Sequence, residues 1–297
     1  MNLSAPSLPL MLGCPVWGCA HWGGEVYPLK TPRSQWLQWY SRTFNTVEGN
    51  STFYALPSVE TTRRWASETA NGFRFMLKFP RVISHDSELE GCQAETNTFL
   101  RCLEQLAESD RLGPTFLQLG PNFGPDRFER LRRYLGGLPH EFQWAVEVRH
   151  LDWFDSGSNE RSLNGLLGDL GIDKVLFDSR PLFDSPPDDE IEKRSQLRKP
   201  RTPIRQTTTG NHPVLRLVGR NRTELVNRFF DQWAPIVAKW IRDGRCPYVF
   251  THAPDDRYAP SLARQFCSRL QQEFSHTSWQ IPLPPSSPQQ LSLLGDL

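Results

Sequence analysis

The chain has 297 residues, a formal net charge of +1 and 25 prolines, and 38% of its residues are hydrophobic. This length suits one α/β barrel, which commonly takes about 250 residues, and the small net charge argues neither for nor against a nucleic-acid partner. No apolar run reaches the roughly 18 residues of a membrane span, and the first residues lack the basic and apolar regions of a signal peptide, so we expect a cytoplasmic protein.

Short β-type runs alternate along the chain with helical patterns, an order typical of parallel βαβ units. Eight strands are predicted, at residues 10–17, 44–49, 73–79, 115–119, 142–148, 174–177, 213–218 and 248–251. The intervals between them leave room each time for a loop and a helix. The predicted fold is therefore α/β, a single TIM-like (β/α)₈ barrel over residues 9–277.

Start and stop signals place several of the helices. Ser58 is a suitable N-cap for a helix that contains Trp65. Apolar residues recur at helical spacing over 223–243, and Pro235 inside this run predicts a kink or a break.

Two segments depart from the barrel pattern. Residues 184–211 are polar and show no apolar helical face, so helix six is expected to be irregular or replaced by an insertion. Residues 278–297 are rich in proline, serine and glutamine and are expected to form a flexible tail.

Polar side chains fall on the inward parity near the ends of seven predicted strands. Alternate residues of a barrel strand face the lumen and the surrounding helices. The inward set comprises Glu48 and Asn50, Lys78, Gln118, Glu147 and Arg149, Asp178, Arg216, and His252. Since a wrapped parallel strand has no solvated face, these groups must pair with one another or meet a ligand at the C-terminal mouth.

Two interpretations of this charge set are open. Glu48, Glu147 and Asp178 could neutralise Lys78, Arg149 and Arg216 as a purely structural network. The following loops, however, carry aromatic residues of the kind that line ligand pockets, among them Tyr54 and Trp153. A pocket for a small anionic substrate is the favoured hypothesis.

No metal and no other cofactor are expected in this pocket. His21, His85, His150 and His252 follow strand ends and could join the carboxylates around a divalent ion. The three fixed cations of the lumen would repel that ion and suit a phosphate or carboxylate better. Only six of the 34 basic residues are lysines; the arginine excess fits bidentate anion binding, although a GC-rich coding bias is the better explanation for it.

The candidate reaction is a hydrolase or lyase step on a phosphate-bearing substrate. Glu147 or Glu48 could act as a general base, Lys78 as a base or nucleophile with a lowered pKa, and His85 as an alternative. The predicted substrate-binding residues are Asn50, Tyr54, Gln118, Arg149, Trp153, Asp178, Arg216 and His252. The chain has no nucleophile elbow, Walker loop or GxGxxG motif, which argues against a serine hydrolase, a P-loop ATPase and a Rossmann dehydrogenase.

Several segments resemble the YecE-like TIM-barrel family, also called domain of unknown function 72. They are FNTVEGNSTFYALPS (44–58), WASETANGFRFMLKFPRVISHD (65–86), FLQLGPNFG (116–124), AVEVRHLDWF (145–154) and, more weakly, VLRLVGRN (214–221). The resemblance spans nearly the whole barrel and implies a TIM barrel without a settled activity.

Carried over residue by residue, the resemblance points to Glu48, Asn50, Ser51, Phe53, Tyr54, Lys78, Pro80, His85, Gln118, Pro121, Glu147, Arg149, His150, Trp153 and Arg216. The chain departs from the family at two strand ends. It has Val218-Gly219 where the family typically has His-Gly, and His252-Ala253 where the family typically has paired Asn. Roles carried by those two positions in the family are not transferred.

The C-terminal tail suggests a macromolecular partner. Its residues Gln290, Leu291, Leu293 and Leu294 resemble the peptide with which bacterial repair and replication proteins bind the sliding clamp. Such a partner would link the barrel to DNA repair or nucleotide metabolism. The alternative function is accordingly a non-catalytic module that docks on the clamp or on nucleic acid.

Overall fold

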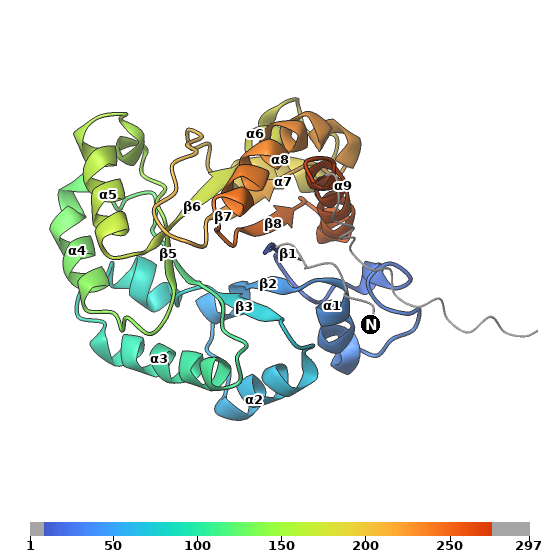
Figure 1. Ribbon diagram of the computed structural model, residues 1–297, viewed down its shortest axis with the longest axis horizontal. Helices are drawn as coiled ribbons and strands as arrows, with labels where there is room; N and C mark the ends of the chain where they lie inside the picture. The colour runs from blue at the N-terminus through green and yellow to red at the C-terminus, as the bar shows by residue number, and fades with distance from the viewer. Residues whose placement is uncertain (1–8, 275–297) are drawn as a thin grey trace, which may run out of the picture.

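The computed structural model describes residues 9–274, and within them eight parallel strands form one sheet in the order β3-β2-β1-β8-β7-β6-β5-β4. The strands are β1 Met11–Cys14, β2 Thr46–Gly49, β3 Arg74–Leu77, β4 Thr115–Gln118, β5 Trp144–Glu147, β6 Asp173–Asp178, β7 Val214–Val218 and β8 Tyr248–His252. Two isolated bridges, Phe75 with Leu112 and Lys78 with Phe116, join the β3 and β4 edges. The sheet is therefore a nearly closed barrel, and the predicted fold class is confirmed (Figure 1).

Helices alternate with the strands and cover the outside of the barrel (Figure 1). They are α1 Trp36–Thr43, α2 Val59–Glu68, α3 Gln93–Glu108, α4 Phe128–Gly136, α5 Ser158–Asp169, α6 Arg180–Phe183, α7 Glu190–Arg198, α8 Asn227–Arg242 and α9 Ala259–Gln272. Ser58 caps α2 as predicted, because its hydroxyl accepts a hydrogen bond from the Thr61 amide. No helix break occurs at Pro235: α8 continues through it, held by an apolar face that is buried on both sides of the proline.

Apolar side chains of the strands form two layers, one inside the barrel and one between the strands and the surrounding helices. Met76, Phe116, Ala145, Val175 and Phe250 form part of an interior cluster. The residues of opposite parity on the same strands pack with the helices in a second, larger cluster. The alternation predicted from the sequence is therefore the alternation of the barrel wall, and it decides which polar groups reach the mouth.

Strands β1 and β2 approach each other unusually closely at Gly13. A Cβ atom at this position would lie 2.1 Å from the carbonyl oxygen of Thr46. Only a residue without a side chain fits there.

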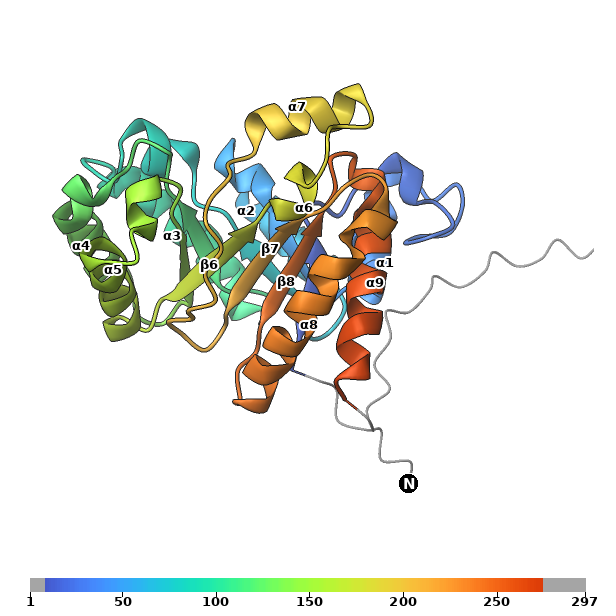
Figure 2. The ribbon, with the colours of Figure 1, turned by 90° about the horizontal axis from the view of Figure 1, so that it is seen from above.

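The region expected to be irregular, residues 184–211, contains the helix α7 and directly follows the one-turn helix α6. The one-turn helix α6 follows β6 directly, and α7 begins after Asp189, whose carboxylate caps it by accepting from the Glu192 amide. The expectation of a purely irregular insertion is therefore wrong for residues 190–198. Figure 2 shows α7 lying across the end of the barrel near β6, β7 and β8, apart from the helices that flank the strands. Its polar composition follows from this position, because a helix over the mouth buries little apolar surface.

Candidate functional site

The floor of the barrel mouth is an ion-pair cluster contributed by three strands. Arg216 of β7 binds Glu48 of β2 in a bidentate manner, with both N···O distances at 2.7 Å. The same guanidinium donates through Nη1 to Glu147 of β5. The three side chains are at most 3% exposed. Strands far apart in the sequence thus bring together two carboxylates and the arginine between them.

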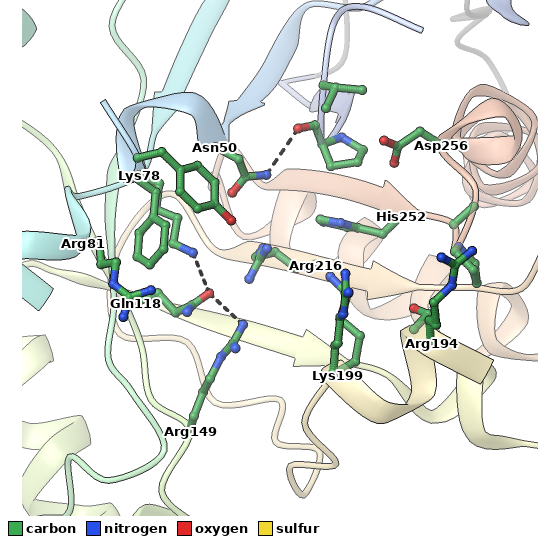
Figure 3. Close-up of a pocket in the computed structure, with 18 of the residues that line it drawn as sticks. Asn50, Lys78, Arg81, Gln118, Arg149, Arg194, Lys199, Arg216, His252 and Asp256 are labelled. Carbon is green, nitrogen blue, oxygen red and sulfur yellow. Dashed lines mark hydrogen bonds between the residues drawn. The ribbon is translucent and has the colours of Figure 1, made fainter. Parts of the chain in front are cut away.

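A chain of polar contacts extends this cluster toward β3 (Figure 3). Arg149 donates through Nε to Glu147 at 2.8 Å and through Nη2 to the Gln118 carbonyl oxygen at 2.6 Å. The same oxygen accepts a hydrogen bond of 3.0 Å from the Lys78 amine. Gln118 therefore connects Lys78 to the ion pairs without providing it with a negative charge.

The two carboxylates of the floor are held in their ionised form. Burial raises the pKa of Glu147, but the Arg216 and Arg149 guanidiniums outweigh burial and lower it to about 2. Glu48 shows the same balance, and Arg216 with His252 places its pKa well below the usual range. A carboxylate with so low a pKa is a weak proton acceptor near neutral pH. The geometry therefore does not favour the general-base role predicted for Glu147 and Glu48.

Of the two lysines that line the pocket described below, Lys78 loses its proton more easily than Lys199. Burial, aided by the Arg216 charge, lowers the pKa of its amine to about 7. The amine lies 3.9 Å from the centre of the Phe53 ring, and the side chain lines the open pocket described below. A near-neutral lysine in contact with a pocket suits proton transfer or nucleophilic attack.

Burial lowers the pKa of both histidines of the predicted site. Burial and the Lys78 charge lower the pKa of His85 to about 4, and its Nδ1 lies 2.8 Å from the Ser84 hydroxyl. Burial also lowers the pKa of His252, against the opposing effect of Glu48. The Nε2 atom of His252 is 3.2 Å from a Glu48 oxygen but is not oriented to form a hydrogen bond with it.

A cavity of about 670 Å³, called the mouth pocket here, opens above this floor. Most of the predicted site residues line it: Asn50, Tyr54, Lys78, His85, Gln118, Arg149, Arg216 and His252. Glu48 and Glu147 lie directly beneath, bound to Arg216. The convergence inferred from strand parity is thus present in the structure.

The sequence analysis missed the cations that α7 and the β3 loop add to the mouth pocket. These are Arg81, Arg194, Arg198 and Lys199, and Asp256 is a further lining residue that was missed. The spacing of Ile191, Arg194, Ser195 and Arg198 was the available signal, since residues three, four and seven apart share one face of a helix. Because the segment is polar throughout, charged residues carry its helical period and no apolar face displays it.

Positive charge in the mouth pocket exceeds the negative charge around it. Within residues 9–274, no carboxylate lies within ion-pair distance of Lys78, Arg194, Arg198 or Lys199. Arg81 does have a partner, Asp86, at 3.1 Å. Burial and the Arg216 charge lower the pKa of Lys199 to about 8, which is the response of an amine that lacks a counter-ion.

Two predicted site residues lie elsewhere. Asp178 faces the helices, where it binds Arg180 and accepts from the Trp233 indole at 2.8 Å. The inward parity assigned to it is wrong, because Val175 of the same strand faces the barrel interior. Phe177 is the β6 residue that faces the interior, and the centre of its ring lies 5.6 Å from the Cζ atom of Arg149. Trp153 is buried, with its indole donating to the Phe123 carbonyl, and it does not line the mouth pocket.

Other predictions concern metals, membranes and the tail. No group of three or more His, Cys, Asp or Glu side chains in the described part of the chain is placed to hold a metal ion. None of the helices within 9–274 has the length and apolar character needed to cross a membrane. Gln290, Leu291, Leu293 and Leu294 lie outside the described residues.

Comparison with known sequences shows one family over most of the chain. The model of the family described as "Protein of unknown function DUF72" matches residues 11–290. The UPF0759 protein YecE of Escherichia coli (strain K12) is 37% identical over 257 residues, which cover 86% of this chain and 92% of that protein. The UPF0759 protein YunF of Bacillus subtilis (strain 168) is 26% identical over 214 residues, or 69% of this chain and 70% of that protein.

Solved structures agree with the fold. A DUF72 family protein of Thermotoga maritima MSB8 (TM1631) matches with a TM-score of 0.66 and 25% identity, covering 88% of this chain and 99% of its own. A DUF72 family protein of Enterococcus faecalis V583 (EF0366) matches with a TM-score of 0.63 and 18% identity, covering 88% of this chain and 97% of its own. Neither description names a ligand or a reaction.

Proposed function

The chain belongs to the DUF72 family of proteins of unknown function, and from the geometry of its mouth pocket we propose that it is an enzyme acting on a small phosphate- or carboxylate-bearing substrate. The observation that carries this proposal is the set of pocket cations without carboxylate partners, Lys78, Arg194, Arg198 and Lys199. Cations held near one another without counter-ions repel, and an anionic ligand removes that repulsion while forming charge-assisted hydrogen bonds.

A catalytic role, beyond binding, rests on Lys78. The pKa of its amine is about 7. Its hydrogen-bond partner Gln118 is neutral and supplies no negative charge. About half of such amines are unprotonated at pH 7, so Lys78 can take a proton from a bound substrate or attack a carbonyl carbon. The ion pairs beneath it keep Glu147 and Glu48 occupied with Arg216 and Arg149, so these carboxylates orient the cations and do not exchange protons.

Pyridoxal 5′-phosphate is a suitable probe, because it combines an aldehyde with a phosphate. The unprotonated amine forms an imine with the aldehyde and releases water, and borohydride then makes the bond permanent for peptide mapping. Since the chain has only six lysines, each can be followed. The expected result at pH 7 is labelling at Lys78 and Lys199, with protection by inorganic phosphate and much weaker labelling by pyridoxal, which lacks the phosphate.

The control residues are the exposed lysines Lys193 and Lys239, which are 58% and 71% exposed and form surface ion pairs. Labelling spread over these lysines, or labelling at Lys78 that phosphate does not reduce, would refute anion binding in the mouth pocket. Once a substrate is found, Lys78→Met should abolish turnover, while the remaining pocket cations still bind the anion with lower affinity. Full turnover by that variant would refute the catalytic role of Lys78.

A further inference from the structure

The helix α7 (Glu190–Arg198) forms a roof over the mouth pocket and is fastened to the end of β7. Its Glu192 is fully buried and accepts from Nε of the equally buried Arg220 at 3.3 Å and from the Asn221 amide at 2.8 Å. The Asn221 side chain also donates to Asp189 at the start of the helix, at 2.9 Å. These contacts fix the roof at its N-terminal end, so the cations on its inner face occupy defined positions.

The inner face of α7 supplies one of two separate sets of cations. Arg194, Arg198 and the following Lys199 line the pocket from the roof and form the outer set. Lys78, Arg81 and Arg149, from β3, its loop and the end of β5, form the inner set. Figure 3 shows Lys199 and Arg194 on one side of Arg216 and Lys78 and Arg81 on the other.

The two sets of cations affect the pKa values of different titratable groups. Besides burial, the pKa of His85 is lowered by Lys78, Arg149 and Arg81. The pKa of His252 is lowered, after burial, by Arg216 and Lys199, and Lys199 is also the charge that most lowers the pKa of Asp256 against the effect of burial. The inner set therefore lies near His85, and Lys199 of the outer set lies near His252 and Asp256.

The middle of the pocket is electrically compensated. Arg216 lies there, bound on both guanidinium edges by Glu48 and Glu147. Two carboxylates around one arginine leave little attraction for a further anion at this point. Cations without an ion-pair partner among residues 9–274 remain on either side, Lys78 on one and the three roof cations, near Asp256, on the other.

Building on the anion-binding function proposed above, we infer that the ligand of the mouth pocket carries two anionic groups joined by a neutral spacer, one bound by the inner set and the other by the outer set. The cavity of about 670 Å³ is large enough for such a molecule. Lys78 of the inner set then acts next to one anionic group, while the roof recognises the distant end.

A series of alkane diphosphonates of increasing chain length tests this inference, each compared by calorimetry with the alkane monophosphonate of the same length. For the best length, the diphosphonate should bind the wild-type protein about tenfold or more tightly than its monophosphonate partner. The double variant R194S/R198S should lose this advantage, so that it binds the two members of each pair with nearly equal affinity. Lys193→Gln, on the exposed side of the same helix, should behave as wild type.

Equal affinities for the two members of every pair would overturn the inference and leave anion binding intact. A double variant that weakens both members to the same extent would also overturn it, because the roof would then act on the whole site and not on a second anionic group. If no phosphonate and no inorganic phosphate binds, the proposed function itself is refuted. The melting temperature of each variant shows whether the fold is preserved.

Discussion

Replacing Arg216 by methionine should destabilise the barrel strongly at neutral pH and less in mild acid. Methionine keeps most of the side-chain volume but leaves Glu48 and Glu147 buried without their shared cation. Removing one partner of a buried ion pair costs about 3–5 kcal/mol. The pKa of Glu147 gives a comparable figure, because its fall from 4.5 to about 2 corresponds to about 3 kcal/mol at ~1.36 kcal/mol per unit.

The sign of the pH effect follows from the direction of that shift. In the wild type the folded state holds the pKa of Glu147 below its ordinary value, so the stabilisation is complete above about pH 4.5 and is lost as the pH falls toward 2. In Arg216→Met the buried carboxylates favour their protonated forms, so the variant gains stability relative to wild type as the pH falls. The difference in free energy of unfolding should therefore be largest near pH 7.

Urea unfolding at pH 7 and pH 5, followed by the fluorescence of the chain's ten tryptophans, measures this difference. Lys239→Met is the control, since this lysine is 71% exposed and its loss should leave stability nearly unchanged. The double variant E48Q/R216M should recover part of the loss, because Glu147 retains Arg149. A deficit below about 1 kcal/mol, or one that does not change with pH, would refute the account of the floor.

Two further predictions concern single positions. After reductive methylation with isotope-labelled formaldehyde, the NMR signal of Lys78 should titrate near pH 7 and that of Lys199 near pH 8; titration of all six lysines near 10.5 would contradict the effect of burial. Gly13→Ala should cost at least about 3 kcal/mol in urea unfolding, since its Cβ would lie 2.1 Å from the Thr46 carbonyl oxygen. Gly165→Ala in α5, which meets no atom within 4 Å, should instead stabilise the protein by roughly 0.5–1 kcal/mol, and a loss of stability in this variant would argue against the helix as described.

Strand parity alone predicted much of the candidate site. The inward positions of Glu48, Lys78, Gln118, Glu147 and Arg216 follow from the two-residue period of a strand, a property that sequence displays directly. For Asp178 the same argument failed, because β6 is buried on both faces and its sequence does not show which parity is inward. Val175 faces the barrel interior, so Asp178 faces the helices.

Sequence by itself determined the order of strands and helices and most of the polar groups that face the lumen, because hydrophobic periodicity is local and repeats within each element. Only the tertiary structure decided that Arg216 holds both floor carboxylates, that the pKa of Lys78 falls to about 7, and that α7 and the following Lys199 place three cations over the mouth. These properties depend on distances between residues remote in the chain. Burial and charge act through space, and no local pattern records them.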